Sequence, residues 1–413
     1  MKRGVSSLNP CAASYIPLSK RNANDRTFET AKDSRSGNES SRIVSNKMST
    51  TPSPIYRGFI SVEGSDINSR SRPDGIRFRL VSYNILARDY VRSSFPHSPS
   101  PCLRWEDRSQ AILSVLKNFG ADFLCLQEVD EYDSFYKGNM ESLGYSSIYV
   151  QRNGQKRDGC GIFYKQKSAE LVLEEKIEYN DLVNSIPDGQ ILGDDKYDVP
   201  TSGNIRAEPE NGLELKKAPK DRGDPNDPRV RLKHDCVGIM AAFKLKDLPD
   251  HVVIVANTHL YWDPKWADVK LDQAKYLLSR LALFRTLVSN RLECMPSVVV
   301  AGDFNSTPGD KVYQYLISGN SQLASAVECL EDMPIPLCSV YAFTRGEPPF
   351  TNCTPGFTNT IDYILFSPTD NIKPVSFLEL PDLNSSDVAG GLPNYCHPSD
   401  HLPIGAEFEI TRD

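Results

Sequence analysis

Polar side chains follow the apolar runs of this sequence at the points where buried strands would end. They include two amides, four carboxylates and two imidazoles: Asn84, Glu128, His259, Asp303, Asn305, Asp362, Asp400 and His401. In a layered β/α protein the ends of the strands converge at one edge, so these groups can share a cleft.

Such a set suits the hydrolysis of a phosphodiester. This reaction needs neutralised phosphate oxygens, an activated water and a stabilised leaving oxyanion. Glu128, Asp303 and the Asn305 amide offer the hard oxygen ligands that Mg²⁺ prefers, and one or two such ions can act as Lewis acid and clamp. A histidine held by a carboxylate is a poised base or transition-state donor. For His401 that carboxylate would be its neighbour Asp400, or else Asp362.

Each group also has an ordinary structural interpretation when taken alone. A carboxylate after a strand is often only solvated, Asp303 in GDFN can make an Asx turn, and a lone histidine is often a satisfied structural one. The coincidence of the whole set at strand ends favours a cleft.

Other chemistries have weaker support in the sequence. Two histidines with Asp303 could bind zinc, but there is no HExxH or HxH pair. There is no GxSxG elbow, P-loop or GxGxxG motif. Ten cysteines without a CxxC pair argue against a zinc framework or a disulfide scaffold.

The elements that must position these groups are short strands and a few helices. Several of the apolar runs are continuous, as in strands buried on both faces. Strands are expected at 76–84, 122–128, 146–150, 159–165, 236–245, 251–259, 297–304, 360–367 and 404–410. Helices are expected from Trp105 to the residue before Gly120, and over 268–289.

Two segments differ in composition from the rest. Residues 1–57 carry ten Lys/Arg against four Asp/Glu, and we predict that residues 1–75 form a disordered basic segment before a domain at 76–412. An organellar targeting role for residues 1–57 is an alternative. Residues 175–232 are dense in turn formers and charges, which predicts a surface insertion. The net charge is −7, and no window is apolar enough to cross a bilayer.

Seven motifs in order resemble the endonuclease/exonuclease/phosphatase superfamily: SYNILA (82–87), LCLQEV (124–129), DGCGIFY (158–164), NTHLYWDP (257–264), GDFNSTP (302–308), IDYI (361–364) and PSDH (398–401). The YNILA, NTHLYWDP and PSDH motifs resemble the carbon catabolite repressor 4 deadenylases with nocturnin and angel, and most of all the plant-type homologues without leucine-rich repeats. The resemblance implies a DNase I-like, four-layered α/β sandwich of two packed mixed β-sheets flanked by helices.

The resemblance also implies roles for individual residues. Glu128 would be the main Mg²⁺ ligand, with Asn84 beside it, and Asp303 and Asn305 would orient the attacking water and help to hold a second ion. His259 would donate to the scissile phosphate. His401, oriented by Asp362 and with Asp400 nearby, would be the base, a metal partner or a transition-state stabiliser.

The substrate implied by the resemblance is single-stranded poly(A) RNA, shortened from its 3′ end with release of 5′-AMP in mRNA decay. The counterparts of the two residues that sandwich adenine in the deadenylases are Pro264 and Phe357, and flat contacts suit base stacking. The resemblance implies cytoplasmic and nuclear sites of action. The absence of leucine-rich repeats argues against membership of the large deadenylase complex, which leaves other mRNA-decay proteins as partners.

Three other functions stay open at this point. A nocturnin-like NADP(H) 2′-phosphatase would use the same metal site, with Lys156 and Arg157 near its substrate. A catalytically inactive RNA-binding adaptor conflicts with the complete set of acidic and histidine residues, and inositol-phosphate hydrolysis is more distant. Leu86 replaces the acidic residue of DNA-repair members, which argues against apurinic-site repair.

Overall fold

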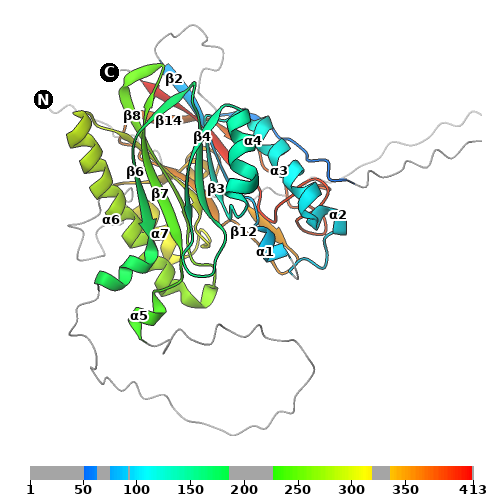
Figure 1. Ribbon diagram of the computed structural model, residues 1–413. Coiled ribbons are helices and arrows are strands. Elements are labelled where there is room, and N and C mark those ends of the chain that lie inside the picture. Colours follow the sequence, from blue (N-terminus) through cyan, green and yellow to red (C-terminus); the bar gives the residue numbers. More distant parts are fainter. Residues whose placement is uncertain (1–50, 63–74, 92–93, 186–226, 319–334, 412–413) are drawn as a thin grey trace, which may run out of the picture. The chain divides into compact units, whose positions relative to one another are not determined.

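The apolar runs form two β-sheets that pack face to face in the computed structural model (Figure 1). The structure describes residues 51–62, 75–91, 94–185, 227–318 and 335–411. Side chains from the facing sides of both sheets make one core, in which the rings of Phe123 and Phe243 lie 5.0 Å apart. All nine predicted strands are present, with ends that differ by a few residues.

The first sheet is mixed and has the strand order β1-β14-β15-β2-β3-β5-β4. Its strands are β1 (Phe59–Ser61), β2 (Gly75–Asn84), β3 (Phe123–Gln127), β4 (Tyr145–Gln151), β5 (Gly159–Lys165), β14 (Ile372–Leu378) and β15 (Ile404–Thr411). Only β2 and β3 are parallel neighbours in this sheet.

The second sheet has the strand order β10-β13-β9-β8-β7-β6, with β8 and β9 as its parallel pair. Its strands are β6 (Ala169–Glu178), β7 (Val237–Leu245), β8 (Leu248–His259), β9 (Ser297–Asp303), β10 (Cys338–Ser339) and β13 (Asp362–Phe366). A separate hairpin consists of β11 (Asn352–Thr354) and β12 (Phe357–Asn359).

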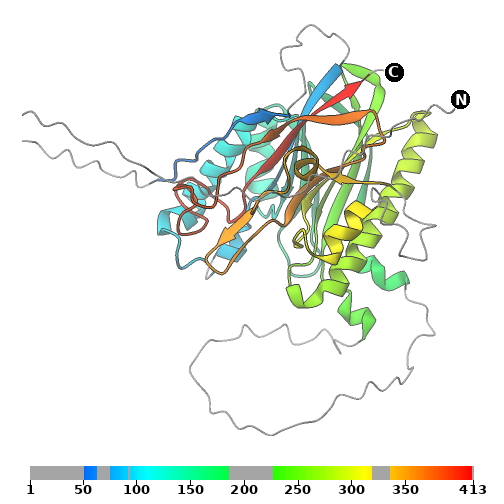
Figure 2. The ribbon, with the colours of Figure 1, turned by 180° about the vertical axis from the view of Figure 1, so that it is seen from behind.

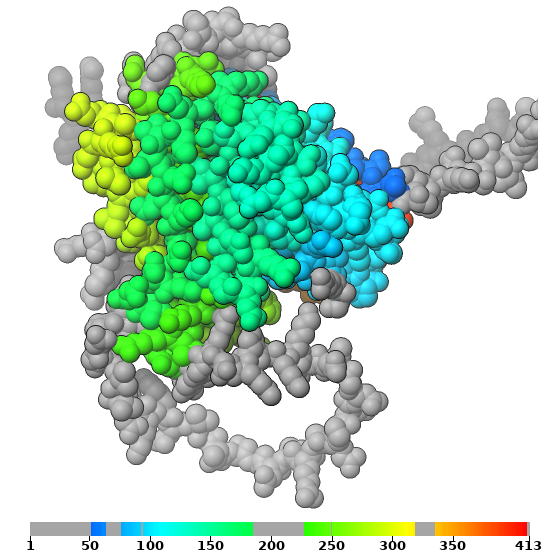
Figure 3. Space-filling model, in the orientation of Figure 1, coloured from blue at the N-terminus to red at the C-terminus, as the bar shows by residue number. Residues whose placement is uncertain are grey.

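Helices cover the outer face of each sheet and complete four layers (Figures 1 and 2). Helices α3 (Trp105–Phe119) and α4 (Lys137–Ser142) pack on the first sheet, whereas α6 (Ala267–Leu292) and α7 (Lys311–Ile317) pack on the second. Figure 3 shows the yellow-green surface of α6 and the cyan surface of α3 at opposite edges of one face, with green residues between them. The four-layered α/β sandwich is therefore confirmed.

Shorter helical segments lie at the ends of strands and in the loops. They are α1 (Arg88–Val91), α2 (Ser100–Leu103), the π-helix η1 (Tyr132–Tyr136), the 3-10 helices η2 (Tyr179–Ser185) and η3 (Pro264–Trp266), α5 (Pro228–Arg231) and α8 (Val340–Thr344). Among the described residues no helix is long and apolar enough to span a membrane.

Both predicted helices form for the reasons that the sequence indicates. Helix α3 ends at Gly120, whose left-handed backbone (φ +57°) suits a residue without a Cβ atom. Helix α6 buries an apolar stripe that runs from Ala274 to Phe284 against the second sheet.

The ordered unit begins earlier than the predicted domain boundary. Residues Thr51–Asp413 cluster as one compact unit, and β1 pairs with β14 although it lies inside the segment predicted to be disordered. The proposed insertion is also shorter at both ends, because β6, η2 and α5 occupy parts of 175–232. Residues 186–226 lie outside the described residues, as do residues 1–50.

Candidate active site

Strand pairing brings the predicted residues to one edge of the sandwich. The parallel pair β2–β3 ends with Asn84 opposite Gln127, and the parallel pair β8–β9 ends with His259 opposite Asp303. Strand β13 pairs antiparallel with β9 and places Asp362 opposite Asp303. Because parallel strands end at the same edge, side chains distant in sequence meet there.

The Asn84 amide joins carboxylates from the two sheets. Its Nδ2 donates to Glu128 Oε1 and to Asp303 Oδ2, each at 3.0 Å, while its oxygen accepts the backbone N–H of Leu86. This network identifies the orientation of the amide, since the opposite one would set its oxygen against two carboxylates. Asn84 therefore presents a donor to the site, and a role as an oxygen ligand would require the amide to turn.

Glu128 lies at the turn directly after β3. Its backbone is left-handed (φ +58°), which is uncommon outside glycine and marks a sharply turned residue at a site. Its Oε2 accepts the N–H of Ala87 at 2.8 Å. Burial, together with the nearby carboxylates of Asp158 and Asp400, raises the pKa of Glu128 to about 8.

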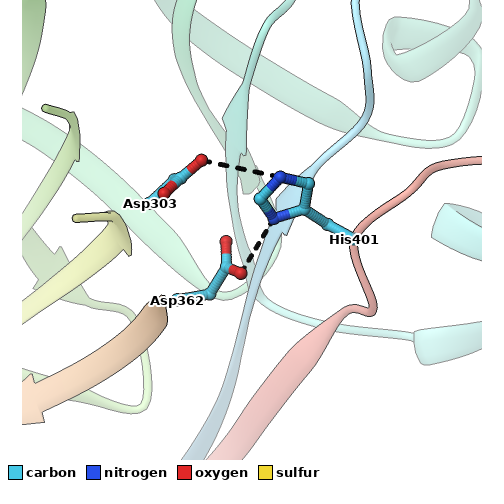
Figure 4. Close-up of side chains that lie close together, drawn as sticks. All are labelled: Asp303, Asp362 and His401. Carbon is cyan, nitrogen blue, oxygen red and sulfur yellow. Dashed lines mark hydrogen bonds and ion pairs between the residues drawn. The ribbon is translucent and has the colours of Figure 1, made fainter. Parts of the chain in front are cut away.

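His401 is oriented by Asp362, so the structure decides between the two predicted partners (Figure 4). Its Nδ1 lies 2.9 Å from Asp362 Oδ2, and its Nε2 faces Asp303 Oδ2 at 3.7 Å. Thr351 Oγ1 donates to the same Asp362 oxygen at 2.6 Å. Burial alone would lower the pKa of His401, but the carboxylates of Asp362, Asp303 and Asp400 outweigh it and raise the pKa well above 6.5.

His259 has the opposite electrostatic environment. Burial, with the positive charges of Arg152 and His401, lowers the pKa of His259 well below 6.5. Its Nε2 lies 3.4 Å from Asp303 Oδ2, and its buried Nδ1 has no hydrogen-bond partner. The site thus pairs a neutral imidazole with one that favours the charged form.

The predicted Asx turn and the predicted cleft are both present at Asp303. Its Oδ1 accepts the backbone N–H of Asn305 at 2.9 Å, which is the Asx turn, while Oδ2 faces the site. Asn305 has a left-handed backbone (φ +49°), and its side-chain Nδ2 donates to Leu260 O. Burial and the Asp362 carboxylate raise the pKa of Asp303.

Glu128, Asp303 and both histidines line one cavity of about 710 Å³. Asp362 lies behind this lining and reaches it through its hydrogen bond to His401. The lining includes Asp400 as well as Pro264 and Phe357, the two residues predicted to contact a base. Lys156 also lines this cavity, but Arg157 is not among its lining residues. Apart from Arg157, the structure therefore brings together the residues that the sequence assigned to catalysis or binding, with Asn84 and Asp362 joined to the lining by hydrogen bonds.

Two buried cations near the site were not identified from the sequence. Arg108 donates to the carbonyls of Ile85 and Leu86 at 2.9 and 2.7 Å, and Lys270 donates to Asn305 O at 2.6 Å. Both hold the backbone of a site loop. The available signal was a charged residue on the buried face of a helix, since Arg108 lies four residues before Ile112.

The donor set fits a divalent metal ion. Burial disfavours the negative charges of Glu128 and Asp303, and a bound cation would stabilise those charges with hard oxygen ligands. Asp303, Asp362 and His401 also bring one ligand atom each within 4.8 Å of one another, a second group among the described residues that could bind a metal.

The fold consists of two packed mixed sheets, and one edge carries buried carboxylates that can bind a metal ion together with two histidines. This combination is typical of a class of phosphate-ester hydrolases. Residues 81–401 match the model of the Endonuclease/Exonuclease/phosphatase family, and the chain belongs to that family.

Similarity to known proteins indicates which members of this family the chain resembles. The chain is 58% identical to Carbon catabolite repressor protein 4 homolog 4 of Arabidopsis thaliana, over 90% of this chain and 95% of that protein. It is 30% identical to the CCR4-Not complex 3′-5′-exoribonuclease subunit Ccr4 of Candida albicans. This second match covers 81% of the chain but only 41% of the fungal protein.

Solved structures agree with this placement. ANGEL2, a 2′,3′-cyclic phosphatase, was solved in complex with adenosine-2′,3′-vanadate and has a TM-score of 0.62 at 26% identity, covering 87% of this chain and 99% of its own. The human Nocturnin catalytic domain has a TM-score of 0.56 at 23% identity, covering 88% of this chain and 100% of its own, and shows the same fold.

Proposed function

We propose that the chain is a Mg²⁺-dependent 3′–5′ exoribonuclease that removes poly(A) tails from mRNA and releases 5′-AMP. The observation that carries the proposal is a single cavity that is lined by three carboxylates and two histidines and also by Pro264 and Phe357. The carboxylates and histidines are Glu128, Asp303, Asp400, His259 and His401. The Candida albicans relative is a 3′-5′-exoribonuclease subunit, which supports this reaction class.

The residues divide the work of hydrolysis. Glu128 and Asp303 would hold Mg²⁺, which when bound neutralises phosphate oxygens and makes water easier to deprotonate. Water adds to the scissile phosphorus, the bond to the upstream 3′ oxygen breaks, and that oxygen leaves with a proton. His259 donates a hydrogen bond to a phosphate oxygen, and His401, oriented by Asp362, stabilises negative charge on the phosphoryl group.

Selectivity for adenine is assigned to Pro264 and Phe357, which line the same cavity. Phe357 lies on β12 with its side chain 42% exposed, and Pro264 is an exposed residue at the start of η3. Two flat surfaces on one cavity suit a base inserted between them, because every base has a π-face for stacking.

The test is a shortening assay on 5′-labelled RNA that ends in oligo(A). We expect a stepwise ladder with Mg²⁺, none with chelator, and slower steps at a non-A tail. Glu128→Gln should lose the activity, whereas Glu170→Gln, which changes an exposed carboxylate on β6, should keep it. The proposal is wrong if folded wild-type protein does not shorten the oligo(A) tail. Reconstitution with Zn²⁺ in a parallel sample tests the alternative metal.

A nocturnin-like NADP(H) 2′-phosphatase is the second candidate. Lys156 favours it, because this cation lines the cavity beside Tyr90, with its Nζ 3.2 Å from the Tyr90 hydroxyl. Because ANGEL2 is a 2′,3′-cyclic phosphatase, an adenosine 2′,3′-cyclic phosphate is a third substrate to assay. Values of kcat/KM, measured for the three substrates with one protein preparation, rank the candidate substrates.

Cellular placement is proposed separately. We propose action in the cytoplasm and nucleus together with mRNA-decay proteins. The chain spans 41% of the CCR4-Not subunit, so the partners of that subunit are not assigned to this protein. Imaging the full chain and a version without residues 1–57 tests whether this segment targets an organelle.

A further inference from the structure

Trp262 is an exposed aromatic residue on the wall of the catalytic cavity. Its side chain is 63% exposed, and it lines the same cavity as His259 and Pro264. A large apolar ring held in water beside a reactive site is an efficient contact for a flat ligand. We propose that Trp262 is a stacking platform for a second base of single-stranded RNA, next to the base assigned to Pro264 and Phe357. This inference rests on the proposed exoribonuclease function.

The loop that carries Trp262 is held in place by neighbouring parts of the site. Leu260 N–H donates to Asp303 O at 3.0 Å, and Tyr261 N–H donates to Gln273 Oε1 on α6 at 2.9 Å. On the other side, Asp263 caps η3 by accepting from Lys265 N at 2.9 Å. A platform that is already ordered loses little conformational entropy when a ligand binds, so stacking on it is efficient.

A cluster of aromatic rings packs against Tyr261, the residue that precedes Trp262. His234 stacks on Tyr261 with centroids 3.7 Å apart, and Trp266 meets the edges of both rings. Arg231 lies 4.1 Å above the Trp266 ring and pairs with Asp268. These rings are partly buried in the cluster. Trp262, with its ring centroid 6.2 Å from that of Tyr261, is its exposed member.

The charges near the platform suit a polyanion. Lys265 is exposed and directly follows Pro264, and Lys233 is exposed beside the His234 ring. Stacking aromatics alternating with cations is the combination that binds the bases and phosphates of single strands. A peptide ligand would use the exposed ring but would have no need of continuity with the catalytic cavity, and this continuity favours RNA.

The experiment couples the protein side chain to one base of the substrate. Oligo(A) substrates with a single abasic nucleotide, moved stepwise from the second position, are assayed with wild-type enzyme, Trp262→Ala and Trp262→Phe. We expect Trp262→Ala to raise KM on intact oligo(A) by about 5- to 100-fold and Trp262→Phe to recover most of the loss. At one abasic position the KM of the wild-type enzyme should rise by the same factor, and Trp262→Ala should raise KM on that substrate no further.

The controls separate this inference from the proposed function. Leu283→Ala removes an equally exposed apolar side chain from α6, outside the cavity lining, and should change no KM value. If wild-type enzyme shortens oligo(A) but Trp262→Ala matches it on every substrate, the platform does not exist and the exposed ring serves another partner. If wild-type enzyme shortens no RNA, the proposed function itself fails.

Discussion

At the residue scale, Asp303 connects most of the site. One oxygen accepts from Asn84 and faces both histidines, and the other forms the Asx turn with Asn305. A buried carboxylate in this position stays charged only if donors or a cation surround it. The two histidines differ in their preferred charge state. Asp362 stabilises the charged form of His401, whereas no carboxylate orients Nδ1 of His259.

Asp362→Asn tests whether the orientation of His401 matters for the chemical step. The variant keeps the shape of the side chain but removes the charge that lies 2.9 Å from Nδ1. We expect kcat to fall by about 100- to 10,000-fold with little change in KM, as when a histidine loses the carboxylate that orients it. Steady-state kinetics on oligo(A) measure this. A rise in KM with an unchanged kcat would instead assign Asp362 to substrate binding.

At the element scale, the segment 51–62 holds the loop that carries His401. Ser53 N–H donates to Tyr395 O and Ile55 N–H to Cys396 O, at 2.8 and 3.2 Å. Arg57 pairs with Asp387 at 3.0 Å, and Asp387 also meets His397 Nε2 at 3.2 Å. The segment that leads into the edge strand β1 is therefore joined to the catalytic loop by backbone and side-chain contacts.

The Asp387 cluster predicts a dependence of stability on pH. Although burial alone would raise it, hydrogen bonds from Ser385, Arg57 and His397 lower the pKa of Asp387 from 3.8 to about 2. A carboxyl with a lowered folded-state pKa stabilises the fold fully above about pH 4, and this contribution is lost as the pH falls toward 2. Asp387→Asn should reduce the free energy of unfolding by about 1–3 kcal/mol at pH 7.

Urea unfolding of both proteins between pH 7 and pH 3 measures this contribution. The difference between wild type and Asp387→Asn should be constant down to about pH 4 and shrink below it. A difference that grows on acidification would contradict the lowered pKa.

A second prediction at this scale concerns the close approach of β8 and β9. A Cβ atom at Gly302, whose φ is +151°, would lie 2.1 Å from Thr258 O. Gly302→Ala must therefore move the backbone that carries His259 and Asp303. We expect it to destabilise the protein by about 2–4 kcal/mol. Gly309→Ala is the matched control, because nothing lies within 4 Å of its added Cβ atom. Equal melting temperatures for the two variants would contradict the clash.

At the scale of the whole molecule, the site spans both sheets and depends on how they pack. Beneath it, Asn257 of β8 donates to Leu126 O and Gly161 O of the first sheet, each at 2.9 Å. Gln127 donates back to Asn257 Oδ1 at 2.7 Å. This buried network joins the sheets where Glu128 and Asp303 must face each other.

A metal that binds carboxylates from both sheets should stabilise the entire fold. We expect Mg²⁺ at about 100 times its Kd to raise the melting temperature by about 2–5 °C, because binding favours the folded state. Glu128→Gln should abolish most of this rise while the melting temperature in chelator stays the same or increases. Differential scanning calorimetry measures it. An unchanged melting temperature at high Mg²⁺ would exclude binding of the ion to the folded protein.

The sequence by itself determined nine of the strands, the two long helices and the set of reactive residues. These are local properties: a run of apolar residues predicts a buried strand, and helical spacing with a terminal glycine predicts where α3 ends. The motifs around Glu128, Asp303 and His401 indicated the family, because chemistry of this kind needs those residue types in loops at strand ends.

Only the tertiary structure decided how these residues act on one another. That His401 takes Asp362 instead of its neighbour Asp400, and that Asn84 turns its nitrogen to two carboxylates, depends on strand register and on sheet packing. The ordering of residues 51–62 and the support from Arg108 likewise come from contacts between segments far apart in the chain. Such contacts leave no local pattern, since their energy arises only when the chain has folded.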